Sequence, residues 1–199
     1  MRATNLSLAI GLTVILAACS REEPAGSPRQ PDAASPSLAE KATPSEPAQE
    51  AVAQIAPTQG NSVNGSVALS GSAQGVHITG SIQGLKPDAD FGFHVHEKGD
   101  CTAPDASSAG GHFNPTQAQH GNPSGPTHHA GDMLNIHSNA EGIAQVDVTV
   151  TGISLHGDPS TDVMGKAIVV HEAPDDYTTQ PSGNSGKRVA CGVIAAPSP

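Results

Sequence analysis

Short segments of alternating or continuous hydrophobic residues recur along the chain after residue 75, and each has the length of a strand. Val76, Ile78 and Ile82 would share one face of a strand, because side chains alternate between faces with period two. No window after residue 60 keeps the apolar spacing of an amphipathic helix. The segments are GVHITGSI (75–82), FGFHVHE (91–97), IAQVDVTV (143–150), GKAIVVHE (165–172) and VACGVIAA (189–196). This pattern predicts an all-β domain, an antiparallel sandwich or barrel.

Two stretches interrupt the strand pattern, residues 97–132 and residues 172–188. Both are rich in Gly, Pro, Asn, Asp and Ser, and neither has strand character. Long loops in a compact domain are usually functional. We therefore expect the functional residues to lie in or beside these two loops.

The N-terminal residues differ in character from the rest of the chain. Arg2 precedes the apolar stretch LSLAIGLTVILAA (6–18), which is too short for a stable membrane span and ends at Cys19. The pattern resembles a bacterial lipoprotein signal, in which residues 1–18 are removed and Cys19 is lipidated. An ordinary secretory signal that contains a cysteine is the alternative. The prediction is an exported protein of the bacterial cell envelope (periplasm), lipid-anchored to the outer membrane.

Residues 19–58 read as a tether between the anchor and the folded domain. They carry seven prolines among Ala, Ser, Glu and Gln. Such a composition buries too little apolar surface to offset the entropy of ordering. We expect a disordered tether over 19–58 and a folded domain over 59–199.

Two cysteines remain once Cys19 is assigned to the lipid, namely Cys101 and Cys191. Export places them in an oxidising compartment, where two cysteines in one domain predict a disulfide. The bridge would close a loop of about 90 residues, for which chain entropy gives roughly 4–5 kcal/mol of stabilisation.

All ten histidines lie in the predicted domain, and several have the spacing of metal ligands. His94 and His96 would project from one face of a strand, and His171 ends another. The pair alone could be two solvated side chains. The first loop, however, adds His112, His120, His128, His129 and Asp132. Nitrogen ligands with one carboxylate suit zinc, so the conjunction predicts a metal site.

Five sequence segments resemble the copper–zinc superoxide dismutase family. The two longest are GFHVHEKGDCT (92–102) and GNSGKRVACGVI (183–194), which are similar to the family's signature stretches. The other three are GGHFNP, HHAGD and VVHEAPDD. The five segments occur in the family's order, and the resemblance covers residues from about 61 to 195. The resemblance implies an eight-stranded antiparallel Greek-key β-barrel with two long functional loops.

The resemblance also implies a role for each residue of the site. The implied copper ligands are His94, His96, His112 and His171. The implied zinc ligands are His112, His120, His129 and Asp132, so His112 bridges the two metals. Asp175 would link a copper ligand to a zinc ligand, Cys101 and Cys191 would pair, and Arg188 would receive the anionic substrate beside copper. His128 is next to His129 and could compete for zinc; spacing to the family's pattern selects His129, whereas the chemistry of the two residues does not. His77, His137 and His156 match no ligand position, and we expect them on surfaces or loops.

The implied activity is dismutation of superoxide to oxygen and hydrogen peroxide. Copper would cycle between two oxidation states, zinc would be structural, and His112 would carry a proton as well as bridge. A non-enzymatic envelope module that binds copper and zinc is the alternative, and a purely structural zinc protein is a third reading. We expect no nucleic-acid partner and no membrane contact beyond the lipid anchor, and the sequence leaves open whether the chain forms a homodimer.

The charge balance of the domain bears on how an anionic substrate would approach. Residues 59–199 contain 13 acidic and 5 basic residues, a net charge near −8. Superoxide is an anion, so a fast enzyme of this charge needs a local positive focus, for which superoxide dismutase is a standard example. Only Lys187 and Arg188 are positive within residues 172–188. We expect them to supply that focus.

Overall fold

The computed structural model describes residues 50–198, and all of these belong to one compact unit. The described residues form nine β-strands and one 3-10 helix, with no α-helix among them. The strands are β1 (Glu50–Pro57), β2 (Asn64–Ser72), β3 (Gly75–Gln83), β4 (Asp90–Phe91), β5 (Phe93–His96), β6 (Ile136–His137), β7 (Ala144–Val150), β8 (Ala167–His171) and β9 (Arg188–Ala195). The short helix η1 spans Ser107–Ala109.

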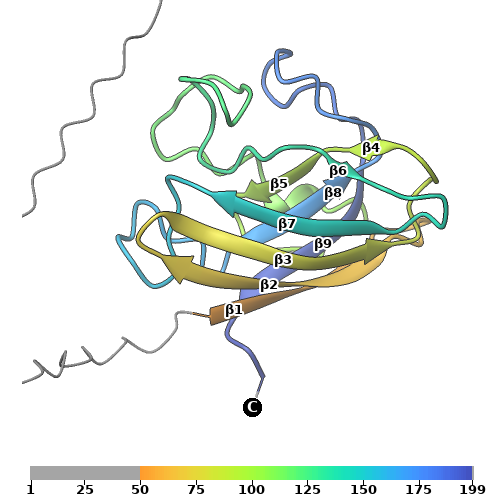
Figure 1. Cartoon of the computed structure of the whole chain (residues 1–199), viewed down its shortest axis with the longest axis horizontal. Coiled ribbons are helices and arrows are strands. Elements are labelled where there is room, and N and C mark those ends of the chain that lie inside the picture. Colours follow the sequence, from red (N-terminus) through yellow and green to blue (C-terminus); the bar gives the residue numbers. More distant parts are fainter. Residues whose placement is uncertain (1–49, 199) are drawn as a thin grey trace, which may run out of the picture. The chain divides into compact units, whose positions relative to one another are not determined.

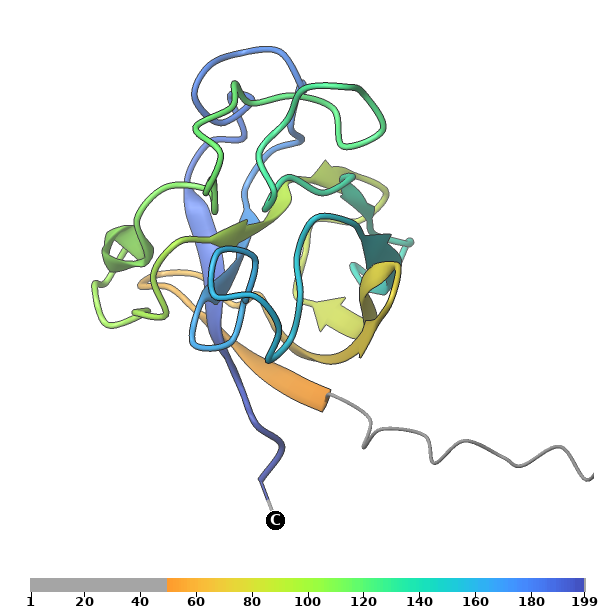
Figure 2. The same ribbon diagram turned by 90° about the vertical axis from the view of Figure 1, so that its left-hand side faces the viewer.

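The strands close into an antiparallel barrel (Figures 1 and 2). Seven strands pair in the order β5-β8-β9-β1-β2-β3-β7, and β4 pairs with β6. A bridge between Ser138 and Ala144 joins the end of β6 to β7. Because only Gly92 separates β4 from β5, the two form one extended stretch that completes the ring. Counted this way the barrel has eight strands, which confirms the predicted fold class.

The barrel interior is filled by the residues that the alternating pattern places on one face. Val76, Ile78 and Ile82 of β3 are fully buried, as are Phe93 and Val95 of β5. Each such side chain contributes about 1.5–3 kcal/mol by leaving water. His94 and His96 point to the other face of β5, where the long loops cover them, so all four residues of this strand are buried. A strand covered on both faces can hold polar ligands away from water.

The two long loops lie on the same side of the barrel, outside its wall (Figures 1 and 2). The first loop lies alongside β5: the Phe113 amide donates to the Val95 carbonyl over 2.8 Å, and the Val95 amide donates to the Gly131 carbonyl over 2.9 Å. A Cβ atom on Gly131 would lie 2.2 Å from the Val95 carbonyl oxygen, so only glycine allows this approach. The loop thereby brings His112 and Asp132 beside the histidines of β5.

The predicted boundary between tether and domain is wrong by one strand. Residues 50–57 form β1, which pairs with β2 and β9 in the centre of the sheet. Ala51, Ala53 and Ile55 alternate inward and are buried. Small alanine side chains next to Gln and Pro resemble the low-complexity segment before them, which hid the alternation. The proposed signal, Cys19 and the rest of the tether lie outside the described residues.

None of the described residues forms a helix long and apolar enough to cross a membrane.

The predicted disulfide between Cys101 and Cys191 is present, with Cα atoms 5.8 Å apart. It joins the start of the first loop to β9, the strand that begins with Arg188. A small apolar cluster that includes Ala106, Ala109 and Val169 surrounds Cys191. The bridge therefore ties the metal-bearing loop to the strand that carries the arginine.

Cys191→Ser should lower the free energy of unfolding by about 2–5 kcal/mol, because the chain loses a crosslink between residues 90 apart. Denaturant unfolding of the parent and the variant measures this. Reduction of the parent protein should reproduce the loss, whereas reduction of the variant should change nothing further. Equal unfolding midpoints for parent and variant would contradict the prediction.

Candidate metal centre

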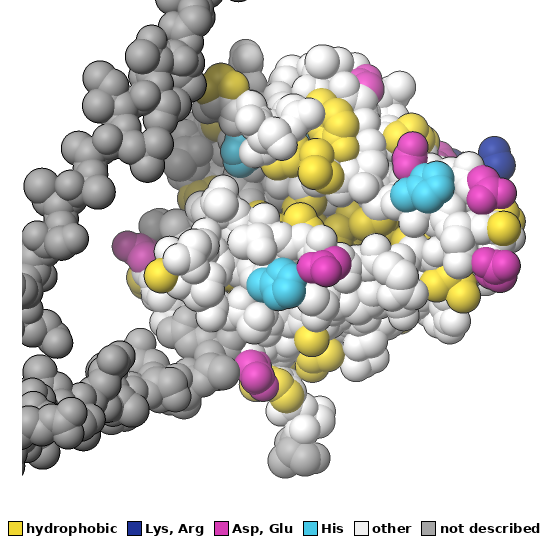
Figure 3. Space-filling model, viewed as in Figure 1, with side chains coloured by type: hydrophobic (Ala, Val, Ile, Leu, Met, Phe, Trp, Pro, Cys, Tyr) yellow, Lys and Arg dark blue, Asp and Glu magenta, His cyan; other side chains and the backbone are white. Residues whose placement is uncertain are grey.

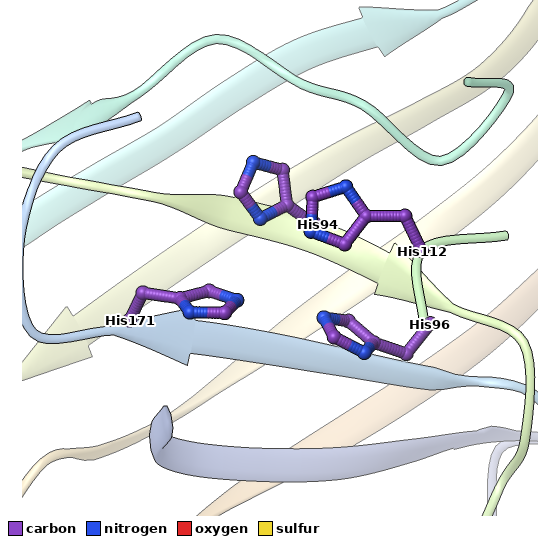
Figure 4. A group of neighbouring side chains, drawn as sticks. All are labelled: His94, His96, His112 and His171. Carbon is purple, nitrogen blue, oxygen red and sulfur yellow. The ribbon is translucent and has the colours of Figure 1, made fainter. Parts of the chain in front are cut away.

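Four histidines from three parts of the chain converge on one space. His94 and His96 come from β5, His171 ends β8 beside a register shift, and His112 lies in the first loop, bridged to His96. One ring nitrogen of each lies within 4.8 Å of the corresponding nitrogen of every other. Figure 4 shows the four rings pointing toward one another. All four residues are buried.

A second group of ligand atoms shares His112 with the first. It consists of His112, His120, His129 and Asp132, all buried. The Asp132 Oδ1 atom lies 2.7 Å, 3.0 Å and 3.2 Å from the Nδ1 atoms of His112, His120 and His129. Ligands at 2.0 Å from a tetrahedral ion are about 3.3 Å apart. These spacings are close to that value, so the group fits a tetrahedral ion.

Unpartnered imidazole nitrogens mark where ions would bind. Six buried ring nitrogens have no hydrogen-bond partner among the described residues, and all six belong to these two groups. They are His94 Nδ1, His96 Nε2, His112 Nε2, His120 Nδ1, His129 Nδ1 and His171 Nε2. Buried polar atoms are rarely left unpaired, because each costs about 1–3 kcal/mol. The donor set therefore fits two metal ions that share one imidazole.

The opposite nitrogens of most of these rings are held by protein acceptors. Asp175 accepts from His94 Nε2 over 2.8 Å and from His120 Nε2 over 2.9 Å, so one carboxylate spans both groups. The Gly110 carbonyl accepts from His96 Nδ1 over 2.9 Å. The Gly186 carbonyl accepts from His171 Nδ1 over 3.4 Å. These contacts fix which nitrogen carries the proton and leave the other free as a ligand.

Burial lowers the pKa of His96, His112 and His171 and so favours the neutral imidazole that a metal ligand requires. Desolvation, aided by neighbouring histidines, lowers the pKa of His171 to about 3. Desolvation lowers the pKa of His112 to about 4, although its bond to Asp132 opposes the shift. Burial alone would raise the pKa of Asp132, but the hydrogen bonds of His112 and His129 outweigh it and hold that pKa well below its usual range. These shifts favour neutral rings at His112 and His171 and an ionised carboxylate at Asp132, the forms in which such groups bind metal ions.

An open cleft of about 480 Å³ leads to the first histidine group. Its walls include His96, Glu97, His112, His171, Pro181 and Arg188. The Arg188 guanidinium is half-buried and donates to the Ala106 carbonyl over 2.6 Å and to the Gly110 carbonyl over 2.5 Å. Gly110 thus accepts from both Arg188 and His96. The shared carbonyl holds the positive charge beside the histidine cluster.

The structure brings all seven predicted ligand residues, Asp175 and Arg188 together and leaves the other histidines outside. His128 belongs to neither group of ligand atoms, and its Nδ1 donates to the His129 carbonyl over 2.7 Å. His77 and His137 pair with Asp147 and Asp90 on the surface. His156 is exposed. Sequence reasoning missed Gly110 and Gln180, which act through main-chain contacts and carry no ligand signal.

Comparison with known proteins decides the relationship. The family model described as copper/zinc superoxide dismutase (SODC) matches residues 63–194, which is most of the chain. The chain belongs to the copper/zinc superoxide dismutase family. Membership makes it an oxidoreductase of the superoxide dismutase class, with copper and zinc as its cofactors.

Two relatives from Aquifex aeolicus illustrate the similarity. The chain is 43% identical to superoxide dismutase [Cu-Zn] 2 over 150 residues, which are 73% of this chain and 86% of that protein. It is 46% identical to superoxide dismutase [Cu-Zn] 1 over 125 residues, 60% of this chain and 73% of that protein.

Solved structures of similar fold and sequence include proteins with other names. A double mutant of a superoxide dismutase-like protein from Bacillus subtilis has a TM-score of 0.66 and 40% identity, covering 73% of this chain and 97% of that one. The clock protein EA4 has a TM-score of 0.67 and 36% identity, and the match covers 75% of this chain and 96% of that one.

Proposed function

We propose that the protein dismutes superoxide to oxygen and hydrogen peroxide at the histidine cluster beside Arg188. One observation carries the proposal: His112 belongs to both groups of ligand atoms, with Nε2 facing the first and Nδ1 the second. With one ring nitrogen directed at each group, His112 would serve as a ligand in both and could also carry a proton.

The first group would hold copper and the second zinc. Four imidazole nitrogens suit copper(II), whereas three imidazoles and a carboxylate in tetrahedral array suit zinc. When bound, copper supplies the one-electron oxidation and reduction that zinc cannot. His94, His96 and His171 would keep the copper in place, with the Asp175 and Gly110 contacts fixing two of the rings.

His112 could deliver one of the two protons that the formation of hydrogen peroxide from superoxide requires, with water supplying the other. Its Nδ1 atom faces Asp132 and the zinc ligands, and its Nε2 atom is unpartnered and faces the copper ligands. A proton held at Nε2 would lie at the floor of the cleft, which His112 lines together with Arg188. Arg188 would draw the anion to the same place. The substrate, the proton and the electron carrier would then meet in one cleft.

The complete ligand set argues against the alternative, an envelope module that binds copper and zinc without catalysis. Storage needs neither a shared imidazole nor a guanidinium held beside it. The test is turnover by the full-length chain loaded with both metals. An enzyme consumes superoxide in large molar excess over its copper and releases oxygen and peroxide in equal amounts. Consumption that stops after one equivalent per copper would favour the alternative.

Export to the bacterial cell envelope, with a lipid anchor at Cys19, is part of the same proposal. The Cys101–Cys191 disulfide is consistent with an exported protein, because disulfides persist in oxidising compartments. The apolar stretch before Cys19 supports a lipoprotein signal. Cys19→Ala should abolish lipid attachment, and mass spectrometry of the N-terminal peptide from the membrane fraction checks this. An unmodified Cys19 in the parent protein would contradict the lipid anchor.

A further inference from the structure

His120 is held by the second loop at three points. Its main-chain amide donates to Gln180 Oε1 over 3.0 Å, and Gln180 Nε2 donates back to the His120 carbonyl over 2.9 Å. Its ring Nε2 donates to Asp175 Oδ1 over 2.9 Å. The remaining ring nitrogen, Nδ1, is the one that faces the second group of ligand atoms.

The Gln180 side-chain amide makes the pair of hydrogen bonds to the His120 main chain that a neighbouring strand would otherwise make. A glutamine offers one acceptor and one donor, spaced so that they match an N–H and a C=O of the same residue. Among the described residues, no other group bonds to the main chain of His120. His120 lies in no helix or strand, so the side chain of Gln180, 60 positions away, fixes the position of the first loop at this residue.

Gly183 covers the contact between His120 and Asp175. It is buried, with a φ of 65°, and a Cβ atom there would lie 1.7 Å from Asp175 Oδ1 and 2.7 Å from His120 Nε2. Its amide donates to the Thr179 carbonyl over 2.7 Å, which folds the segment back on itself. Any side chain at position 183 would displace the carboxylate or the imidazole.

We propose that Gln180 and Gly183 are positioning residues of the second metal group. Gln180 fixes the His120 main chain, and Gly183 keeps the bond between the ring and Asp175 intact, so that Nδ1 stays aimed at the ion. The inference rests on the proposed zinc assignment. Removing a group that hydrogen-bonds to a metal ligand typically lowers metal affinity or activity by about 10- to 100-fold.

The test is zinc release from the full-length, metal-loaded chain into excess chelator. Gln180→Ala should release zinc about 10-fold faster than the parent, at the lower end of that range because the Asp175 contact remains. Gln180→Glu keeps the acceptor but loses the donor, so its rate of zinc release should lie between those of the parent and Gln180→Ala. Gln83→Ala is the matched control, because Gln83 also donates one side-chain hydrogen bond, to Asn64, but lies on the surface of β3. It should release zinc at the parent's rate.

Two further readouts separate positioning from general stability. The unfolding midpoint of the metal-free chain should change no more for Gln180→Ala than for Gln83→Ala. Cobalt bound in place of zinc should show an altered visible spectrum in Gln180→Ala, since that spectrum reports ligand geometry. Zinc release from Gln180→Ala at the parent's rate would overturn this inference alone. A parent chain that takes up no zinc would overturn the zinc assignment and the inference together.

Discussion

Arg188→Ala should lower the rate constant for superoxide dismutation by about 10- to 100-fold at low ionic strength, the scale of electrostatic focusing, while both metals stay bound. The chain is acidic, and acidic side chains outnumber basic ones on the face shown in Figure 3. Arg188 is the one cationic side chain among the described residues that line the cleft. Removing it leaves the substrate with the repulsive field of the whole domain.

The contacts of Arg188 predict how milder substitutions behave. Arg188→Lys keeps a charge but loses the planar fork that reaches both the Ala106 and Gly110 carbonyls, so it should lose less activity than the alanine variant. Glu97 is the one carboxylate among the described residues lining the same cleft. Glu97→Gln should therefore change the rate in the opposite direction, a modest increase at low salt.

The measurement is the rate against ionic strength, with metal content matched for all four proteins. Salt screens the attraction that Arg188 supplies, so the parent's rate should fall with added salt more steeply than that of the alanine variant. If Arg188→Ala shows both the parent's rate and the parent's salt dependence, Arg188 does not guide the substrate.

Asp132→Ala should destabilise the metal-loaded protein by about 3–5 kcal/mol, the scale of losing one partner from a buried charged network. Its Oδ1 atom faces three histidines, and its Oδ2 atom accepts from the amides of His129 over 2.8 Å and Gly121 over 3.1 Å. The carboxylate thus organises the first loop through its own hydrogen bonds, and it would do so further through the ion that we propose it helps to bind.

His171→Ala is the matched comparison, because His171 belongs only to the first metal group. Its ring makes one long hydrogen bond of 3.4 Å, to the Gly186 carbonyl, at the end of a well-paired strand. We expect a smaller loss of stability, roughly 1–2 kcal/mol, as for one buried hydrogen bond. Denaturant unfolding with and without chelator measures both variants. Equal stabilities of Asp132→Ala and the parent, both fully loaded, would refute the structural role of this group.

The strands and ligands that the sequence predicts correctly are those with local signals. Alternation in 75–82 and 143–150 marks β3 and β7, and histidines one residue apart on a strand must share a face. β1 was missed because its inward residues include two alanines, which resemble those of the preceding segment. The hydrogen bonds of the Gly110 carbonyl to His96 and of the Gln180 side chain to the His120 main chain were missed, because they depend on which loops lie close together in the fold. Pattern alone could not choose between His128 and His129, whereas the fold turns only His129 toward Asp132.

The proposed function requires copper in the first histidine group, and a copper titration tests this directly. The full-length, zinc-loaded chain receives copper in steps, and bound copper and dismutation rate are measured on each sample. The rate should rise in proportion to bound copper, reach its limit at one copper per chain, and stay flat beyond. A chain that binds one equivalent of copper and still shows no dismutation would contradict the proposed function.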